Sequence, residues 1–508
     1  MPSPNSTLVQ CTSCEELTPH NPKHTFLKIR HPLPSTITTD AYFPFIPAPL
    51  PRPGTPSGSL STATFTTSSI PPQHASGLSF HPHNWGVTSS PPSQSQKTTA
   101  VPSPTFIDTV NQFGFKLLSL LAAEECPAAI APSNIYRCLM MAAAGSQGAN
   151  LDAFAKVLSF DATALHGTVK NIVQLDGYCR PAKQAGSGGG VELEVGSSVW
   201  YGRSMVIEHE WAEIMRRVFE ARFGEQDAGE INAWVREKTK GRIQEVVKEH
   251  EITDMDVKLI SCLYFKAGWE RPFEKSSTKR DVFCDFDGAA MPCDMMHRTG
   301  DIMYWEDEVA QMCVLPYRNS KKQGPSPFLG ASPSFASSND STEPSWNAAI
   351  ILPKHPGISS ILAILSHFST SPSALRSLLN TNPSNTSNLS PTYLHLSLPR
   401  FTLTLSADLS PTLFDRGLRP ISLPSLNFAP MTRSQPAFVT KIKHDLFVEV
   451  NEEGTEVAAA TTMAVFGGAA GPVRKPVEMR VGRPFLFLVF DGEAGVVVAM
   501  GVVNEVKG

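Results

Sequence analysis

Apolar residues recur at helical spacing in the first half of the chain. In TFIDTVNQFGFKLLSLLAAEE (105–125) they fall three or four positions apart, which predicts an amphipathic helix. Pro132 marks the start of a second apolar helix, and a Gly-rich break separates this helix from a third that ends near Leu158. Two more amphipathic helices are predicted over 208–223 and 227–247.

Strand-like patterns dominate the later part of the chain. Residues 191–202 alternate between polar and apolar, and residues 257–269 form a near-continuous apolar run, which is typical of a strand in the middle of a sheet. Further short strands are predicted at 393–409, 437–450, 484–490 and 495–503, with DGEAG as a hairpin turn between the last two. Because helices come first and strands follow, rather than alternating, the predicted fold class is α+β.

Three segments that break these patterns are rich in Pro, Ser and Thr. The longest covers residues 1–104, and the other two cover 320–345 and 370–391. Such segments cannot bury enough apolar surface to offset the entropy that ordering would cost. We therefore expect a disordered arm over 1–104 and a folded domain over 105–508 that two low-complexity insertions interrupt.

Composition and charge exclude several classes of partner. The formal net charge is -4, so nothing indicates nucleic acid or an anionic membrane. No apolar run reaches the ~20 residues that span a bilayer. The N-terminus has neither the basic start nor the apolar core of a secretory signal, which favours the cytoplasm or, because the segment is Ser-rich and acid-poor, an organelle.

The cysteines and the known catalytic motifs give no sign of a metal site or an enzyme. Cysteine occurs 9 times, scattered through apolar patterns, as expected for reduced thiols. Cys11 and Cys14 form a single CxxC with no second pair and no nearby histidine. No GxSxG, HExxH or P-loop motif occurs in the sequence. We expect no metal, no cofactor and no enzymatic activity.

Five segments together resemble the serpin family over about residues 105–506. They are APSNIYRCLMMAAAGSQG (131–148), INAWVREKTKGRIQEVV (231–247), LISCLYFKAGWERPF (259–273), EVNEEGTEVAAATT (449–462) and RPFLFLVFDGEAGVVVAMGVV (483–503). The resemblance implies the serpin fold, with three β-sheets, eight or nine helices and an exposed reactive-centre loop over 452–475. One departure is an edge strand reduced to FGEQ (223–226), so we expect the main sheet to lose or shorten one edge.

The resemblance also implies a mechanism. A target protease attacks the exposed loop and forms an acyl-enzyme, after which the loop inserts as a new middle strand of the main sheet and distorts the attached protease. The residues that correspond to the family's hinge are Glu452, Glu453, Gly454, Thr455, Glu456, Val457, Ala458, Ala459 and Ala460.

The residues that follow Gly454 suit a strand that becomes buried. Alternate side chains of an inserted strand turn into the core, and here they are Thr455, Val457, Ala459, Thr461, Met463 and Val465. None is charged, and burying an unpaired charge would cost several kcal/mol. Gly454 supplies backbone freedom, and no proline between residues 452 and 470 removes a ladder donor.

The position of the scissile bond follows from the family's spacing. About fourteen residues after the hinge glycine lies Gly468–Ala469, which suits a serine protease with a shallow pocket, of the elastase or subtilisin type. Phe466 is an alternative that suits a chymotrypsin-like pocket. Arg474 or Lys475 would suit a trypsin-like pocket, but the inserted strand would then be longer and would contain Pro472.

Four polar residues resemble the cluster that the family places where its main sheet opens. His444 matches the family's histidine, whereas Ser133, Asn134 and Ser261 belong to blocks whose usual residues have changed. If Asn134 and Ser261 have exchanged roles, the hydrogen bonds survive. We expect this cluster to control sheet opening and to take no part in catalysis.

We therefore predict a monomeric inhibitor of a serine protease that acts as a suicide substrate, with a cysteine protease as a second candidate target. The alternative within the same family is a non-inhibitory storage, carrier or chaperone-like binding protein. The resemblance also leaves the extracellular space open as a location. The two functions differ in one observable, because only the inhibitor forms a protease complex that survives boiling in SDS.

Overall fold

The structure is a computed structural model that describes residues 101–124, 128–180, 191–318, 344–381, 389–434, 436–455 and 475–506. Almost all of the arm predicted over 1–104, and most of the insertion predicted over 320–345, lie outside these ranges. Within them, no helix is long and apolar enough to cross a membrane.

The main sheet carries the candidate site. Its strands follow the order β10-β11-β12-β4-β2-β3, and β11 and β4 also pair directly with each other as parallel neighbours. The near-continuous apolar run of the sequence becomes β4, which is buried along most of its length, as a central strand should be. The strands are β10 (Phe401–Asp408), β11 (Phe438–Asn451), β12 (Gly454–Thr455), β4 (Asp256–Gly268), β2 (Glu192–Tyr201) and β3 (Arg222–Glu225).

The remaining strands form one continuous hydrogen-bonded sheet in which two parts share the long strand β6 (Ala290–Glu306). Its first half pairs with β5, its end pairs with β7, and β9 pairs along its middle. The order is β1-β15-β14-β8-β7-β6-β9-β13, so the three expected sheets are present, with two of them joined through β6. The other strands are β1 (Ala128–Ile130), β5 (Lys279–Cys284), β7 (Ala310–Pro316), β8 (Trp346–Pro353), β9 (Ser390–Pro399), β13 (Val477–Arg480), β14 (Phe485–Asp491) and β15 (Val497–Val503).

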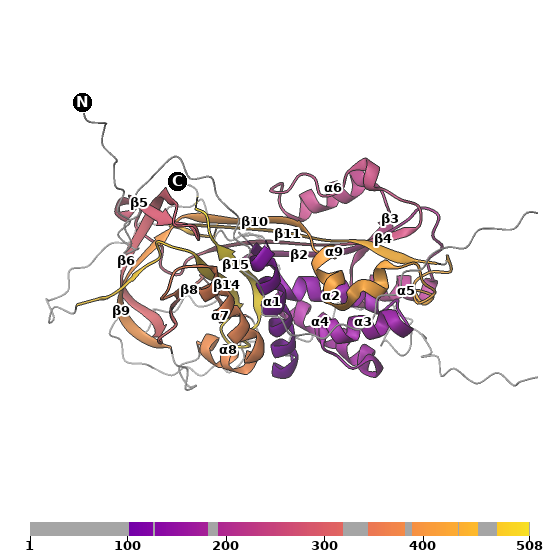
Figure 1. The fold of residues 1–508 in the computed structure, drawn as a ribbon, viewed down its shortest axis with the longest axis horizontal. Helices are drawn as coiled ribbons and strands as arrows, with labels where there is room; N and C mark the ends of the chain where they lie inside the picture. Colours follow the sequence, from indigo (N-terminus) through magenta and orange to yellow (C-terminus); the bar gives the residue numbers. More distant parts are fainter. Residues whose placement is uncertain are drawn as a thin grey trace, which may run out of the picture. The chain divides into compact units, whose positions relative to one another are not determined.

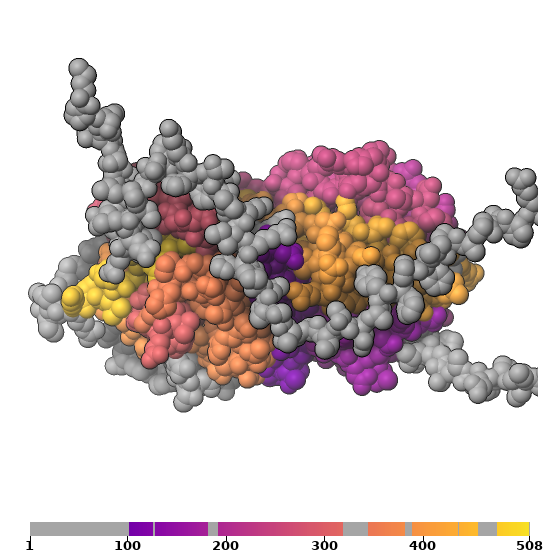
Figure 2. Space-filling view, in the orientation of Figure 1, coloured from indigo at the N-terminus to yellow at the C-terminus, as the bar shows by residue number. Residues whose placement is uncertain are grey.

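Helices cover both faces of the main sheet. Figure 1 shows α2 on one face and α6 on the other, and both helices contact β2 and β4. In the space-filling view α6 and the chain around it, coloured pink, form an outer layer (Figure 2). Nine α-helices occur in the described ranges: α1 (Pro104–Glu124), α2 (Pro132–Ala143), α3 (Gly148–Leu158), α4 (Leu165–Cys179), α5 (His209–Glu213), α6 (Ala228–Lys238), α7 (Ile358–Thr370), α8 (Pro372–Leu379) and α9 (Ser410–Leu413).

The segment over 370–391 differs from its prediction as a low-complexity insertion. Helix α8 lies inside it, and Leu375, Leu378 and Leu379 of this helix are buried. The prediction is wrong for this part, because leucines three and four positions apart give the helix an apolar face that outweighs the Ser-rich composition. Residues 382–388 lie outside the described ranges.

The edge of the main sheet is shortened, as the sequence indicates. Residues 222–225 form the four-residue strand β3, which pairs with the end of β2 in parallel. The helix predicted over 208–223 is correspondingly shorter. It consists of α5 and one π-helical turn over 214–218, because the chain must leave the helix to reach the sheet edge.

Candidate functional site

The hinge already lies inside the main sheet. Thr455 of β12 pairs with Val450 of β11 and with Ala267 of β4, in both cases antiparallel. Beyond this level β11 and β4 pair directly with each other, down to Phe438 and Asp256. We call this direct pairing of β11 with β4 the seam. After Glu453 the chain therefore starts a middle strand between β11 and β4, at the end of the seam marked by Val448 and Phe265.

Glycine is the residue type that the backbone at position 454 accommodates. Its φ is 149°, a conformation that L side chains rarely adopt. A Cβ placed there would lie 2.2 Å from the carbonyl oxygen of Ala267 and 2.6 Å from the Cα of Gly268. The glycine thus allows the hinge to lie directly against β4.

The side chain of Thr455 points into the core. It is fully buried, and its hydroxyl forms a 2.8 Å hydrogen bond with the hydroxyl of Tyr317. The Tyr317 ring stacks on Trp269 with centroids 4.6 Å apart, and the Trp269 indole N–H donates to the carbonyl of Asn451 at 2.9 Å. Thr455 therefore occupies the inward face that the alternation of the sequence assigns to it.

The two carboxylates before the glycine anchor the hinge in different ways. Glu452 is 2% exposed and receives hydrogen bonds from the Arg400 guanidinium at 2.9 Å and from the Thr278 hydroxyl at 2.5 Å. Burial alone would raise the pKa of Glu452, but the Arg400 and Thr278 hydrogen bonds outweigh it, so the pKa is lowered. Glu453 instead makes a 2.6 Å ion pair with the exposed Lys275.

We predict that Arg400→Ala destabilises the intact protein by about 1–3 kcal/mol, because Glu452 would stay buried with the Thr278 hydroxyl but without its counterion. The measurement is the free energy of unfolding from denaturant titration at pH 7.5. Arg433→Ala is the matched control, since Arg433 also binds a carboxylate, Glu208, at 2.8 Å but is 74% exposed. Equal destabilisation by the two variants would contradict the anchoring role of Arg400.

His444 holds the seam together from within the core. Its Nε2 accepts a hydrogen bond from the backbone N–H of Ala131 at 3.0 Å, so the proton of the neutral ring resides on Nδ1. Nδ1 then donates to the Ser261 hydroxyl at 2.8 Å, across the seam from β11 to β4. Burial lowers the pKa of His444 to about 3, so the ring stays neutral and acts as a hydrogen-bond partner.

Asn134 lies beside this pair but bonds elsewhere. Its amide donates to the carbonyl of Cys262 at 2.7 Å, and its carbonyl oxygen accepts from the Ser197 hydroxyl at 2.5 Å. Asn134 thus ties α2 to β4 and β2, while Ser261 takes the contact with His444. Sequence reasoning missed two members of the cluster, the Ala131 backbone and Ser197, because nothing in the local sequence marks either as a long-range partner.

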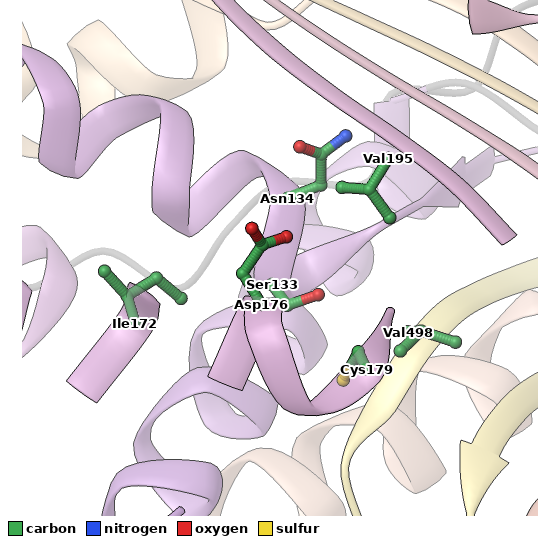
Figure 3. A pocket seen from close by; sticks show the side chains of 7 residues that line it. All are labelled: Ser133, Asn134, Ile172, Asp176, Cys179, Val195 and Val498. Atoms are coloured by element: carbon green, nitrogen blue, oxygen red, sulfur yellow. The ribbon is translucent and has the colours of Figure 1, made fainter. Parts of the chain in front are cut away.

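Ser133 is separate from the cluster. It lines a small hollow between α2, α4, β2 and β15, together with Asn134, Ile172, Asp176, Cys179, Val195 and Val498 (Figure 3). Asp176 in this lining makes a 2.7 Å ion pair with Arg180. Of the four predicted cluster residues, His444 and Ser261 are joined by a side-chain hydrogen bond, and Asn134 bonds to the backbone carbonyl of Cys262, the residue after Ser261.

The remaining predicted site residues fall outside the described ranges. These are the hinge residues Glu456, Val457, Ala458, Ala459 and Ala460, the bond Gly468–Ala469, and the alternatives Phe466 and Arg474. After Lys475 the chain forms β13, which pairs in parallel with β9. Among the described residues, no group of three or more His, Cys, Asp or Glu side chains is arranged to hold a metal ion.

Comparison with known proteins identifies the family. The family model described as Serpin (serine protease inhibitor) matches residues 108–506. The chain belongs to the serpin family. An uncharacterised serpin-like protein of Thermococcus kodakarensis is 25% identical over 405 residues, which cover 78% of this chain and 84% of that protein.

Solved serpin structures confirm the fold. The native state of the thermophilic serpin tengpin matches with a TM-score of 0.65 and 20% identity, covering 83% of this chain and 98% of tengpin. Thyroxine-binding globulin in complex with thyroxine matches with a TM-score of 0.62 and 18% identity, covering 80% of this chain and 100% of that one. The serpin fold thus occurs both in protease inhibitors, after which the family is named, and in a hormone-binding protein.

Proposed function

We propose that this serpin inhibits a serine protease as a suicide substrate, by inserting its loop into the seam between β11 and β4. The observation that carries the proposal is the position of β12. The hinge is hydrogen-bonded on both sides as the first two residues of a middle strand, so cleavage of the loop need only extend a strand that has already begun.

The side chains of the loop match the sheet that would receive them. A strand that continues from Thr455 in the same register meets one residue of β4 and one of β11 at each level. On the inward face these are Phe265 and Val448 for Val457, Leu263 and Leu446 for Ala459, Ser261 and His444 for Thr461, and Leu259 and Ile442 for Met463. The apolar residues would meet apolar neighbours, and the one hydroxyl would meet the polar pair.

Thr461 would take over the hydrogen bond that insertion breaks. Separating β11 from β4 parts His444 from Ser261, which would leave buried polar atoms without partners. The Thr461 hydroxyl can accept from His444 and donate to Ser261 at that level. Insertion in this register therefore keeps the core hydrogen bonds satisfied.

The length of the seam supports Gly468–Ala469 as the reactive bond. In the same register Phe466 comes level with Asp256, the first residue of β4. Cleavage after Gly468 would leave two residues to connect the inserted strand to the protease, whereas cleavage after Arg474 would leave eight outside the sheet. A small residue at the cut favours an elastase- or subtilisin-like target over a chymotrypsin-like one that would cut at Phe466.

The test is to incubate the full chain with a panel of serine and cysteine proteases, then boil the mixtures in SDS. We expect a covalent complex with a protease of shallow pocket, and release of a C-terminal fragment that begins at Ala469. Each protease with its catalytic nucleophile blocked is the control, because it cannot form the acyl-enzyme. Loop cleavage by the panel without any covalent complex would reject inhibition and favour a non-inhibitory binding protein.

A further inference from the structure

Asp445 is a buried carboxylate with no hydrogen-bond partner in the part of the chain that the structure describes. It follows His444 in β11, so its side chain points to the opposite face of the sheet. Its relative exposure is 0%, and neither carboxylate oxygen has a hydrogen-bond partner among the described residues. A buried ionised group in this state costs free energy unless it is paired.

The neighbours of Asp445 offer little compensation. Across the sheet its register partners are Ser406 of β10 and Cys262 of β4. Burial raises the pKa of Asp445 to about 6, against smaller lowering effects of the Ser406 hydroxyl and of the Lys443 charge two residues earlier. Ser406 is near enough to lower the pKa of Asp445 slightly, but its hydroxyl does not form a hydrogen bond with the carboxylate.

Helix α6 lies above this face, and its Lys238 is near another acid. Trp234 of α6 packs over Gly196 of β2, which is the register partner of Cys262. Lys238, also on α6, lies 3.9 Å from the carboxylate of Glu194 on β2. Lys238, the α6 cation that acts on Cys262, therefore also interacts with Glu194.

A second buried aspartate, Asp491, differs from Asp445 in its hydrogen bonds, although burial raises its pKa as well. Asp491 of β14 is also 0% exposed, but it accepts hydrogen bonds from the Tyr178 hydroxyl at 2.8 Å and from the backbone N–H groups of Ser345 at 2.6 Å and Ala494 at 2.7 Å. Asp491 stabilises a turn. Asp445 has the same burial and none of these donors, and it lies in the seam.

We propose that ionised Asp445 is a destabilising group built into the closed seam, and that it favours separation of β11 from β4. Separation moves Cys262 and the helix layer carried by β2 and β4 away from the carboxylate, so that water can reach it. The effect of Asp445 on the stability of the native protein follows from the closed structure alone. Its effect on loop insertion rests on the proposed function.

The dependence on pH has a defined sign. The closed sheet binds the Asp445 proton more readily than the unfolded chain, whose aspartate has its ordinary pKa near 3.8. The destabilisation is therefore complete above about pH 6 and disappears as the pH falls towards 4. Lowering the pH from 7.5 to 5.0 should remove roughly half of the difference between the native protein and a variant without this charge.

The experiment compares Asp445→Asn and Asp491→Asn in the full chain by thermal unfolding at pH 7.5 and 5.0. Asp445→Asn should raise the Tm by about 3–6 °C at pH 7.5 and by clearly less at pH 5.0. Asp491→Asn should lower it at pH 7.5, because it disrupts satisfied hydrogen bonds. A Tm for Asp445→Asn that is lowered, or raised equally at both pH values, would overturn the proposal.

A second measurement tests the link to insertion. With a protease that the unmodified protein inhibits, Asp445→Asn should raise the number of inhibitor molecules consumed per protease at least twofold, because slower opening gives the acyl-enzyme time to hydrolyse. An unchanged number despite a raised Tm would overturn the insertion part. If the unmodified protein traps no protease, the proposed function fails, and the thermal measurement still decides the role of Asp445 in stability.

Discussion

Replacing Thr455 with arginine should convert the protein from an inhibitor into a substrate. Thr455 is fully buried, and its hydroxyl is hydrogen-bonded to that of Tyr317, so a guanidinium at this position would enter the core. Burying that charge would cost several kcal/mol, so the hinge would stay outside the sheet and insertion could not begin. We expect the loop to be cleaved at an unchanged rate while the yield of covalent complex falls at least 100-fold, since about 3 kcal/mol corresponds to that factor.

Thr455→Ser is the matched control, because it keeps the hydroxyl that bonds to Tyr317 and adds no charge. It should retain most of the covalent complex. The measurement is the ratio of complex to cleaved product on SDS gels with the protease found in the panel. An undiminished complex with Thr455→Arg would show that insertion does not proceed through the hinge.

Cleavage of the loop should raise the melting temperature sharply. The inserted strand would bury three larger side chains, Val457, Met463 and Val465, each worth roughly 1.5–3 kcal/mol. Together they contribute about 5–10 kcal/mol, which for a domain of this size is roughly 7–14 °C in Tm. The measurement is thermal unfolding of the intact protein and of the same protein cut once in the loop.

A cut elsewhere in the chain is the control that distinguishes the effect of loop insertion on the Tm from the effect of cleaving the chain. Limited proteolysis within residues 319–343, far from the hinge in sequence, should leave the Tm unchanged or lower it. A loop-cleaved form no more stable than the intact protein would mean that the cleaved segment stays outside the sheet. That outcome would favour the non-inhibitory alternative.

The sequence predicts the elements that local patterns encode. The apolar run over 257–269 became β4, Pro132 opens α2, and Gly454 and Thr455 of the EEGTE motif pair within the main sheet. The α8 helix was missed because composition was given more weight than the spacing of its leucines. The continuity of β6 through two sheets was missed as well, since pairing partners are set by tertiary packing.

The site was predicted in outline and corrected in detail by long-range contacts. A polar cluster around His444 was expected, but its partners include the backbone of Ala131 and the hydroxyl of Ser197, which come from distant parts of the chain. The pairing of Gly454 and Thr455 with both neighbouring strands depends on the space beside Ala267 and Gly268. The missing partner of Asp445 could not be foreseen either, because only the packed sheet shows which donors are absent.

The most direct test of the account is a crystal structure of the protein cut in its loop. The account predicts a continuous strand from Thr455 to about Phe466 between β11 and β4, with the Thr461 hydroxyl within hydrogen-bond distance of His444. It also predicts that His444 and Ser261 no longer touch. A cleaved structure in which β11 and β4 still pair from Val448 and Phe265 downwards would contradict it.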